Sequence, residues 1–181
     1  NSFCTLLTGA TDYEAKMATP LSDAALTALL RHSRRIAVLG YSATPSRASN
    51  SVSAYMASNG HRVVGVNPAA ASAAPPAGIA AVVPTLAAAY ETFAITLDAK
   101  SADGGAQPAI EIVDVFRNPE ALPGIAAEVL ELPVKPRLVF LQEGVTHAAA
   151  EASLRAAGID VVSDRCILKE HQRLVALASG L

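Results

Sequence analysis

This chain has few charged residues and a small net charge. They make up 17% of its 181 residues, against 51% hydrophobic residues, which predicts a globular chain rather than a disordered one. The formal net charge of −2 lacks the basic excess that nucleic-acid binding requires. No apolar run reaches the ~18 residues that cross a bilayer, which argues against a membrane span. The length suits one domain with a sizeable core.

Cysteine is scarce as well. Cys4 and Cys166 are the only two, and a single disulfide between them would not be a framework for a chain of this size. We therefore expect a reduced, intracellular protein, in the cytoplasm or, in a eukaryote, in the mitochondrial matrix.

The first 16 residues lack both a start methionine and the features of a targeting peptide, whereas Met17-Ala18-Thr19-Pro20 would make a natural start. We expect residues 1–20 to be an N-terminal extension that is flexible or foreign to the native chain. Residues 21–181 are expected to form a single domain.

The rest of the sequence alternates between strand and helix patterns. A continuously apolar run, residues 36–39, ends at Gly40, and residues 63–66 repeat the pattern after a helix whose N-cap is Ser49 or Asn50. Further strands are expected at the end of 69–84 and over 93–97, 110–116, 138–141 and 159–162, and helices over 22–31, 85–90, 119–132, 146–157 and 167–178. The alternation predicts an α/β fold: a Rossmann-like, doubly wound and mainly parallel sheet with helices on both faces.

Ligands of such a sheet bind beyond the carboxyl ends of the strands, which here lead into the loops 40–49, 67–70, 116–119 and 142–146. In the first loop Gly40 allows close approach of the backbone, Ser42 and Ser49 offer hydroxyls, and Arg47 suits a phosphate. The amides at the start of the following helix would point to the same place. This pattern favours a phosphorylated ligand, although a tight turn with an N-cap serine and a solvent-facing arginine fits it as well.

The glycine motif of dinucleotide-binding domains is absent. Tyr41-Ser42-Ala43-Thr44-Pro45 follows Gly40, where G-x-G-x-x-G would be needed. Asn67-Pro68 ends the second strand, where an NAD-binding domain needs an acidic residue for the ribose. Alone, Asn67-Pro68 is equally typical of a simple turn. Together with the missing glycines it argues against a nicotinamide cofactor.

Five motifs, in order along the chain, carry a resemblance to a known family. They are G-Y-S-A-T-P-S-R-A-S-N-S-V (40–52), G-H-R-V-V-G-V-N-P (60–68), I-V-D-V-F-R-N-P-E (112–120), L-Q-E-G-V (141–145) and D-R-C-I-L-K-E-H-Q-R-L (164–174). Over residues 35–174 the chain resembles the small CoA-binding protein family, which is similar to the N-terminal CoA-binding domain of the succinyl-CoA synthetase α subunit. The resemblance implies coenzyme A, or an acyl-CoA, as the cofactor.

The resemblance also implies which residues contact which part of CoA. The ADP phosphates would be wrapped by Gly40, Ser42, Pro45, Arg47 and Ser49. Asn67 and Pro68 would shape the adenosine side, the pantetheine arm would lie along Val115, Phe116 and Arg117, and its far end near Gln142, Glu143 and Gly144. The chain departs from the pattern in three places: Ala69-Ala70 replaces a lysine of the synthetase domain, 69–84 is less charged than the family's connector, and 93–108 looks like an insertion that adds an edge hairpin or covers part of the cleft.

Candidate catalytic residues cluster near the end of the chain: Asp164, Arg165, Cys166, Glu170 and His171. Cys166 would be a nucleophile if His171 lowered its thiol pKa, but their spacing puts them on different faces of one regular helix. In the structural alternative Asp164 caps that helix, Cys166 is a small buried side chain, and Glu170 and His171 bind neighbouring loops. No spacing of His32, His61 or His147 is typical of a metal site. Asp114, inside a strand, must be paired or lie at the open edge, so it is either structural or lines the cleft.

We therefore predict a module that binds coenzyme A or an acyl-CoA without intrinsic ligase activity. A chain of 181 residues has no room for the phosphohistidine domain and the ATP-binding subunit of a synthetase. Two alternatives stay open: a subunit of a larger assembly with a degenerate CoA site, and a nucleotide- or acyl-CoA-dependent enzyme that uses Cys166. The expected partners are the CoA ligand and a second copy or a partner subunit, with no nucleic acid and no membrane.

Overall fold

A six-stranded, all-parallel sheet forms the centre of the protein, in the strand order β3-β2-β1-β4-β5-β6. The computed structural model describes residues 21–71, 74–95 and 107–176, so the expected N-terminal extension lies outside the described residues. The strands are β1 (Arg35–Leu39), β2 (Arg62–Val66), β3 (Ile79–Val83), β4 (Ile112–Val115), β5 (Leu138–Leu141) and β6 (Asp160–Val162). This confirms the predicted Rossmann-like α/β fold.

The strand sequences explain why the sheet is parallel and covered on both faces. Every residue of β4 and β5 is buried, and so are the last four of β1 and of β2. A strand that is buried on both faces has an unbroken apolar sequence, and such sequences are typical of parallel sheets between two layers of helices. In β3, at one edge of the sheet, only Ile79 and Val82 are buried.

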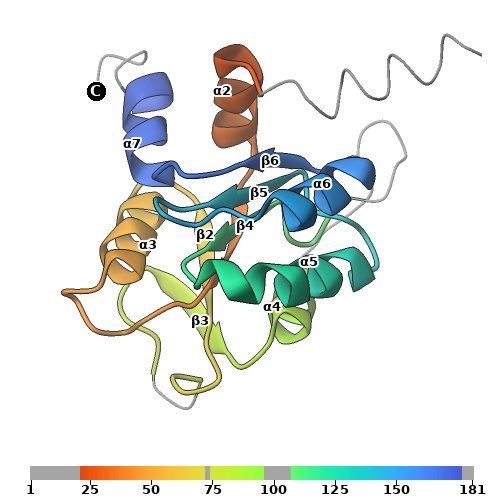
Figure 1. Ribbon diagram of the computed structural model, residues 1–181. Helices are drawn as coiled ribbons and strands as arrows, with labels where there is room; N and C mark the ends of the chain where they lie inside the picture. Colours follow the sequence, from red (N-terminus) through yellow and green to blue (C-terminus); the bar gives the residue numbers. More distant parts are fainter. Residues whose placement is uncertain (1–20, 72–73, 96–106, 177–181) are drawn as a thin grey trace, which may run out of the picture.

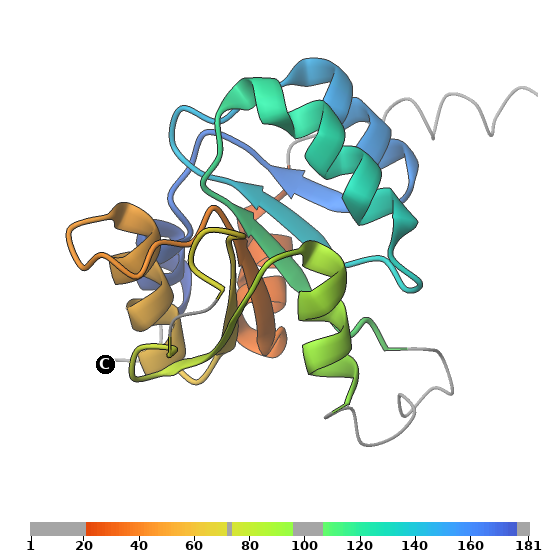
Figure 2. The same cartoon turned by 90° about the horizontal axis from the view of Figure 1, so that it is seen from below.

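Two layers of helices cover the sheet (Figures 1 and 2). On one face, α4 (Leu86–Ala94), α5 (Leu122–Glu131) and α6 (Ala148–Ala156) enclose a core that includes Phe93, Val113 and Val139. On the other, α2 (Asp23–His32), α3 (Ala48–Ser58) and α7 (Ile167–His171) pack around Leu26 and Phe140. A 3₁₀ turn (Pro119–Ala121) precedes α5, and a π turn (Gln172–Ala176) follows α7.

The predicted strand over 93–97 is wrong where the structure describes it. Phe93 is fully buried in α4, with Leu86 and Ala89 on the same face. The Thr85 side chain caps this helix by accepting a hydrogen bond from the amide of Ala88 at 3.2 Å. The helix therefore begins before the apolar run 93–97, and the start of that run forms its last turn. The expected insertion, 93–108, lies largely outside the described residues, which omit 96–106.

Two predicted helix caps are also wrong. The N-cap of α3 is Arg47, not Ser49 or Asn50, and it makes no side-chain capping hydrogen bond. The N-cap of α7 is Cys166 rather than Asp164. In both cases the polar side chain bonds to a neighbouring loop instead of its own helix, as described for the candidate site below.

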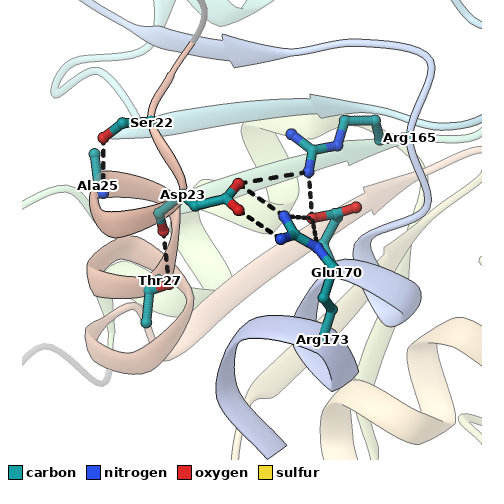
Figure 3. Close-up of polar contacts among 7 residues, drawn as sticks. All are labelled: Ser22, Asp23, Ala25, Thr27, Arg165, Glu170 and Arg173. Atoms are coloured by element: carbon teal, nitrogen blue, oxygen red, sulfur yellow. Dashed lines mark hydrogen bonds and ion pairs between the residues drawn. The ribbon is translucent and has the colours of Figure 1, made fainter. Parts of the chain in front are cut away.

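Charged side chains join α2 to α7 and to the π turn that follows it (Figure 3). The Arg173 guanidinium donates to Asp23 Oδ1 at 2.7 Å and to Glu170 Oε2 at 2.8 Å, and Glu170 also accepts from Arg165. The hydrogen bonds from Arg173 are the main reason that the pKa of Asp23 is lowered from 3.8. The network ties the first described helix to the last.

We expect Asp23→Asn to lower the melting temperature near neutral pH and low ionic strength. The stabilisation is present above the ordinary Asp pKa of 3.8 and is lost as pH falls through the lowered folded value, so wild type and variant converge in acid. They also converge in about 1 M salt, where the Debye length is about 3 Å. Glu120→Gln, which removes an exposed carboxylate with no ion pair among the described residues, is the control. A gap between wild type and Asp23→Asn that is unchanged by salt and acid would contradict the prediction.

Candidate functional site

The candidate site lies at the carboxyl ends of β1, β2, β4 and β5. The chain runs outward from β1 through β2 to β3, and then continues on the other side of β1 with β4. At such a reversal the loops after β1 and β4 diverge to opposite faces, which leaves a crevice for a ligand. Each of the sequence-predicted site residues belongs to the end of one of these strands or to the loop that follows it, except Ser49, which lies in the first turn of α3.

Gly40 makes the closest approach in this crevice. Its φ is +80°, and a Cβ here would lie 2.4 Å from the carbonyl oxygen of Phe116 and 2.8 Å from Cδ of Arg117. No residue with a side chain fits without moving the backbone. Gly40 thus lets the loops after β1 and β4 meet.

Two of the polar residues predicted to contact the ligand hold the loop after β1 itself. Ser49 is buried, and its hydroxyl accepts a hydrogen bond from the amide of Ser42 at 3.1 Å. Asn67 donates from Nδ2 to the carbonyl of Tyr41 at 2.7 Å and accepts from the amide of Ala69 at 3.0 Å. The side chains of Ser49 and Asn67 therefore fix the backbone around a ligand.

Two arginines of the site are exposed. Arg47 ends the first loop, directly before α3, and Arg117 follows β4. Neither makes an ion pair or a side-chain hydrogen bond to the residues that the structure describes. The first amides of α3 and the positive end of its dipole accompany Arg47. Pro45 and Pro68 are also exposed on these loops.

The residues after β4 and β5 differ in what they leave accessible. Val115 is fully buried, so its side chain supports the site from the core, while Phe116 is half-buried. Gln142 is buried and donates from Nε2 to Oδ1 of Asp114 at 2.7 Å. Glu143 and Gly144 are exposed.

The Glu143–Gly144 turn is anchored by α7 and by the loop before it. The amide of Gly144 donates to Oδ1 of Asp164 at 2.8 Å, and Lys169 donates to Glu143 at 2.6 Å. Asp164 itself has a φ of +56°. These contacts bridge 20 and 26 positions in the chain, so no local signal in the sequence could have indicated them.

A cavity of about 800 Å³ opens beside Gly40 and runs between α4 and α5. Its inner end is lined by Gly40, Pro68 and Arg117, and its walls are mainly apolar, with Leu86, Ile125 and Leu132 among them. Three exposed carboxylates, Glu91, Glu128 and Glu131, also line it. No pattern in the sequence distinguishes these three glutamates from the ordinary polar residues of an amphipathic helix, so they could not be predicted as site residues.

The candidate catalytic residues are not assembled into a reactive group. His171 is buried, and its Nδ1 lies 3.0 Å from the Tyr55 hydroxyl, while no hydrogen bond joins it to Cys166 within the described part of the chain. Cys166 is half-buried, and Glu170 belongs to the network between α2 and α7. The described residues contain no group of three or more His, Cys, Asp or Glu side chains placed to hold a metal. They also contain no helix that is long and apolar enough to cross a membrane.

Comparison with known proteins shows which family the chain belongs to. The family model described as CoA binding domain matches residues 34–172. The chain is 34% identical to the uncharacterized protein YneT of Bacillus subtilis over 150 residues, which cover 83% of this chain and 94% of YneT. The solved structure of cell-free ID.343 from Thermus thermophilus is 37% identical, has a TM-score of 0.68, and is matched over 84% of this chain and 98% of its own.

A hypothetical protein from Pyrococcus horikoshii is similar in structure too. It is 25% identical, with a TM-score of 0.66 over 87% of this chain and 97% of its own. The family match covers four of the five motifs in full and nearly all of the fifth, and so confirms the resemblance. The chain belongs to the family of CoA-binding domains.

Proposed function

We propose that this protein binds coenzyme A or an acyl-CoA at the carboxyl ends of β1, β2, β4 and β5, and that it does so as a binding module without ligase activity. One observation carries the proposal: an apolar cavity meets, at Gly40, two loops that each present an arginine with no ion-pair partner among the described residues. A ligand with an anionic part and a long uncharged part matches this combination.

The charges of the site favour one orientation of the bound ligand. Arg47 and the first amides of α3 favour phosphates on the loop after β1. Glu91, Glu128 and Glu131 repel phosphates from the cavity between α4 and α5. The phosphates of CoA would therefore stay at the loop, and an uncharged portion of the ligand would enter the cavity. Its volume of about 800 Å³ falls within the usual range of small-molecule sites.

The arrangement of the histidines and the cysteine supports binding without turnover. A covalent mechanism needs a nucleophile beside a base. Among the residues that the structure describes, no base forms a hydrogen bond with the Cys166 side chain, and His171 and His61 are buried on the face away from the cavity.

Titration calorimetry with CoA tests the proposal. We expect wild type to bind CoA, and Arg47→Ala to bind it about tenfold to a hundredfold more weakly, because a hydrogen bond to a charged group contributes about 1.5–3 kcal/mol. Arg31→Ala, which removes an exposed arginine at the last turn of α2, should bind CoA as wild type does. NAD should produce no heat, since the site lacks an acidic ribose ligand at Asn67.

Two outcomes would contradict the proposal. If wild type gives no heat with CoA at millimolar concentration, the site is degenerate or is completed by a partner subunit. If Arg47→Ala and Arg31→Ala bind CoA equally, the loop after β1 is not the phosphate site.

A further inference from the structure

A glycine lies on the side of α5 that faces the cavity. Gly124 lines the cavity together with Ala121, Ile125 and Glu128, and the spacing of three and four residues puts all of them on one face of the helix. A Cβ added at Gly124 would have no atom within 4 Å, so the space beside it is open. An alanine would fit there and would suit a helix better than glycine does. Folding alone therefore does not explain Gly124, whereas a ligand group in the cavity would.

The walls of the cavity suit an aliphatic group. Leu86 of α4 and Ile125 of α5 line it, and so do Leu39 and Val66, the last residues of β1 and β2. With ten residues, α5 extends one wall over about 15 Å. Apolar walls favour an alkyl chain over the pantetheine arm, because the amide groups of that arm need hydrogen-bond partners. The part of an acyl-CoA that matches these walls best is therefore its acyl chain.

The charges along the cavity narrow the choice of acyl group. Glu91, Glu128 and Glu131 line it, and none of them makes an ion pair with another described residue. An acyl group that ends in a carboxylate would have to leave water and would also meet these like charges. A cationic end would have to leave water too, and exposed carboxylates offset little of that cost. An uncharged chain avoids both costs.

We propose that the cavity between α4 and α5 binds the acyl group of an acyl-CoA and selects uncharged aliphatic chains, with Gly124 as the residue that keeps room for the chain. The three glutamates of its walls act against acyl groups that end in a carboxylate. The inference rests on the proposed function, because it is CoA that brings the acyl group to the cavity. It makes an acyl-CoA, rather than free CoA, the preferred ligand.

Ligands that differ only in the length of the acyl chain test the walls. From acetyl-CoA through butanoyl-CoA to hexanoyl-CoA, we expect the affinity of wild type to rise about threefold to tenfold for each pair of added methylenes, because more apolar surface is buried. An affinity that does not change along the series would overturn the inference and leave CoA binding standing. If neither these ligands nor free CoA bind, the proposed function fails and the inference with it.

Gly124→Leu fills the open space beside α5. We expect this variant to lose most of the preference for hexanoyl-CoA over acetyl-CoA, and Gly124→Ala to lose part of it. Leucine and alanine both favour helices and the added Cβ meets no atom, so the urea midpoints should not fall. Ala127→Leu, at an exposed position of α5 outside the cavity lining, should keep the preference of wild type. If Gly124→Leu folds and keeps that preference, Gly124 does not determine the specificity.

A matched pair of ligands tests the selection by charge. Succinyl-CoA is butanoyl-CoA with a carboxylate in place of the terminal methyl group, and we expect wild type to bind it about tenfold more weakly or worse. Glu128→Gln should narrow this difference about twofold to fivefold at low ionic strength. Glu120→Gln, which removes an exposed carboxylate outside the cavity lining, should leave the difference unchanged. Equal affinities of wild type for the two ligands would overturn the selection of uncharged chains.

Discussion

Replacing Gly65 by alanine is expected to destabilise the native protein by about 1–3 kcal/mol. Gly65 lies in β2, and a Cβ there would come within 2.5 Å of two ring atoms of Tyr41. Cβ atoms of real proteins do not approach other atoms so closely, and either the ring or the strand would have to move. Against a total stability of about 5–15 kcal/mol, such a loss is a large fraction.

The ring of Tyr41 has little freedom to move. It is fully buried, the Tyr41 carbonyl accepts from Asn67, and the hydroxyl lies 3.4 Å from Nδ2 of Asn50. β2 is equally constrained, because it is hydrogen-bonded to β1 on one side and to β3 on the other. Displacing Tyr41 would also shift the loop after β1, so Gly65→Ala should weaken CoA binding in addition.

Urea denaturation measures this prediction. Gly124→Ala is the matched control: Gly124 lies in α5, and a Cβ added there would have no atom within 4 Å, so alanine should be neutral or stabilise by up to about 1 kcal/mol. Tyr41→Leu should relieve the clash, which makes the cost of Gly65→Ala smaller in that background. If the urea midpoint of Gly65→Ala equals that of wild type, the Tyr41 ring moves aside without cost and the prediction is wrong.

The sheet could be predicted because its signals are local. The apolar runs of β1 and β5 and the Gly40 turn each occupy a few consecutive residues. An apolar run that ends at a turn and alternates with helix patterns along the chain is typical of a parallel strand buried on both faces. The run around Phe93 could not be assigned in the same way. Short apolar runs suit a strand and a buried helix equally, and the Thr85 cap decides between them only once the helix is seen.

The candidate site was predictable only in part, for a related reason. Gly40 and Arg47 could be recognised because the turn that Gly40 makes and the start of the helix after Arg47 are close together in the sequence. Ser49 was predicted to cap α3 but bonds to Ser42, and Asp164 was predicted to cap α7 but bonds to Gly144. Such choices depend on which loops the fold brings together.

Asp114 shows the same limit. The sequence left open whether this carboxylate is paired within the fold or lies at the open edge of its strand. The structure buries it and pairs it with Gln142, 28 positions away in the chain. Only the alignment of β4 with β5 puts the two side chains together.

The second large effect concerns pH. His61, directly before β2, is 4% exposed and lies 5.5 Å from His171, measured between the ring centroids. Burial, and to a lesser extent His171 and Arg34, lower the pKa of His61 from 6.5 to about 4, which the Ser33 backbone only partly offsets. The folded protein therefore keeps His61 neutral at a pH where the unfolded chain has bound a proton.

This difference makes the native state less stable in mild acid. The contribution of a neutral His61 is complete above pH 6.5 and is lost progressively as pH falls toward 4. At about pH 5 the loss amounts to about 2 kcal/mol, and the lowered pKa of His171 acts in the same direction. His61→Leu should remove most of the dependence, so that the variant gains on wild type between about pH 8 and about pH 5 by that amount.

Urea denaturation of wild type and variants at both pH values separates this effect from ordinary packing. A leucine that packs poorly would lower stability equally at the two pH values, whereas loss of the buried imidazole changes the difference between them. His32→Leu removes an exposed histidine from α2 and should leave the pH dependence of wild type intact. If His61→Leu and His32→Leu depend on pH alike, the buried histidine pair does not control the acid stability of this fold.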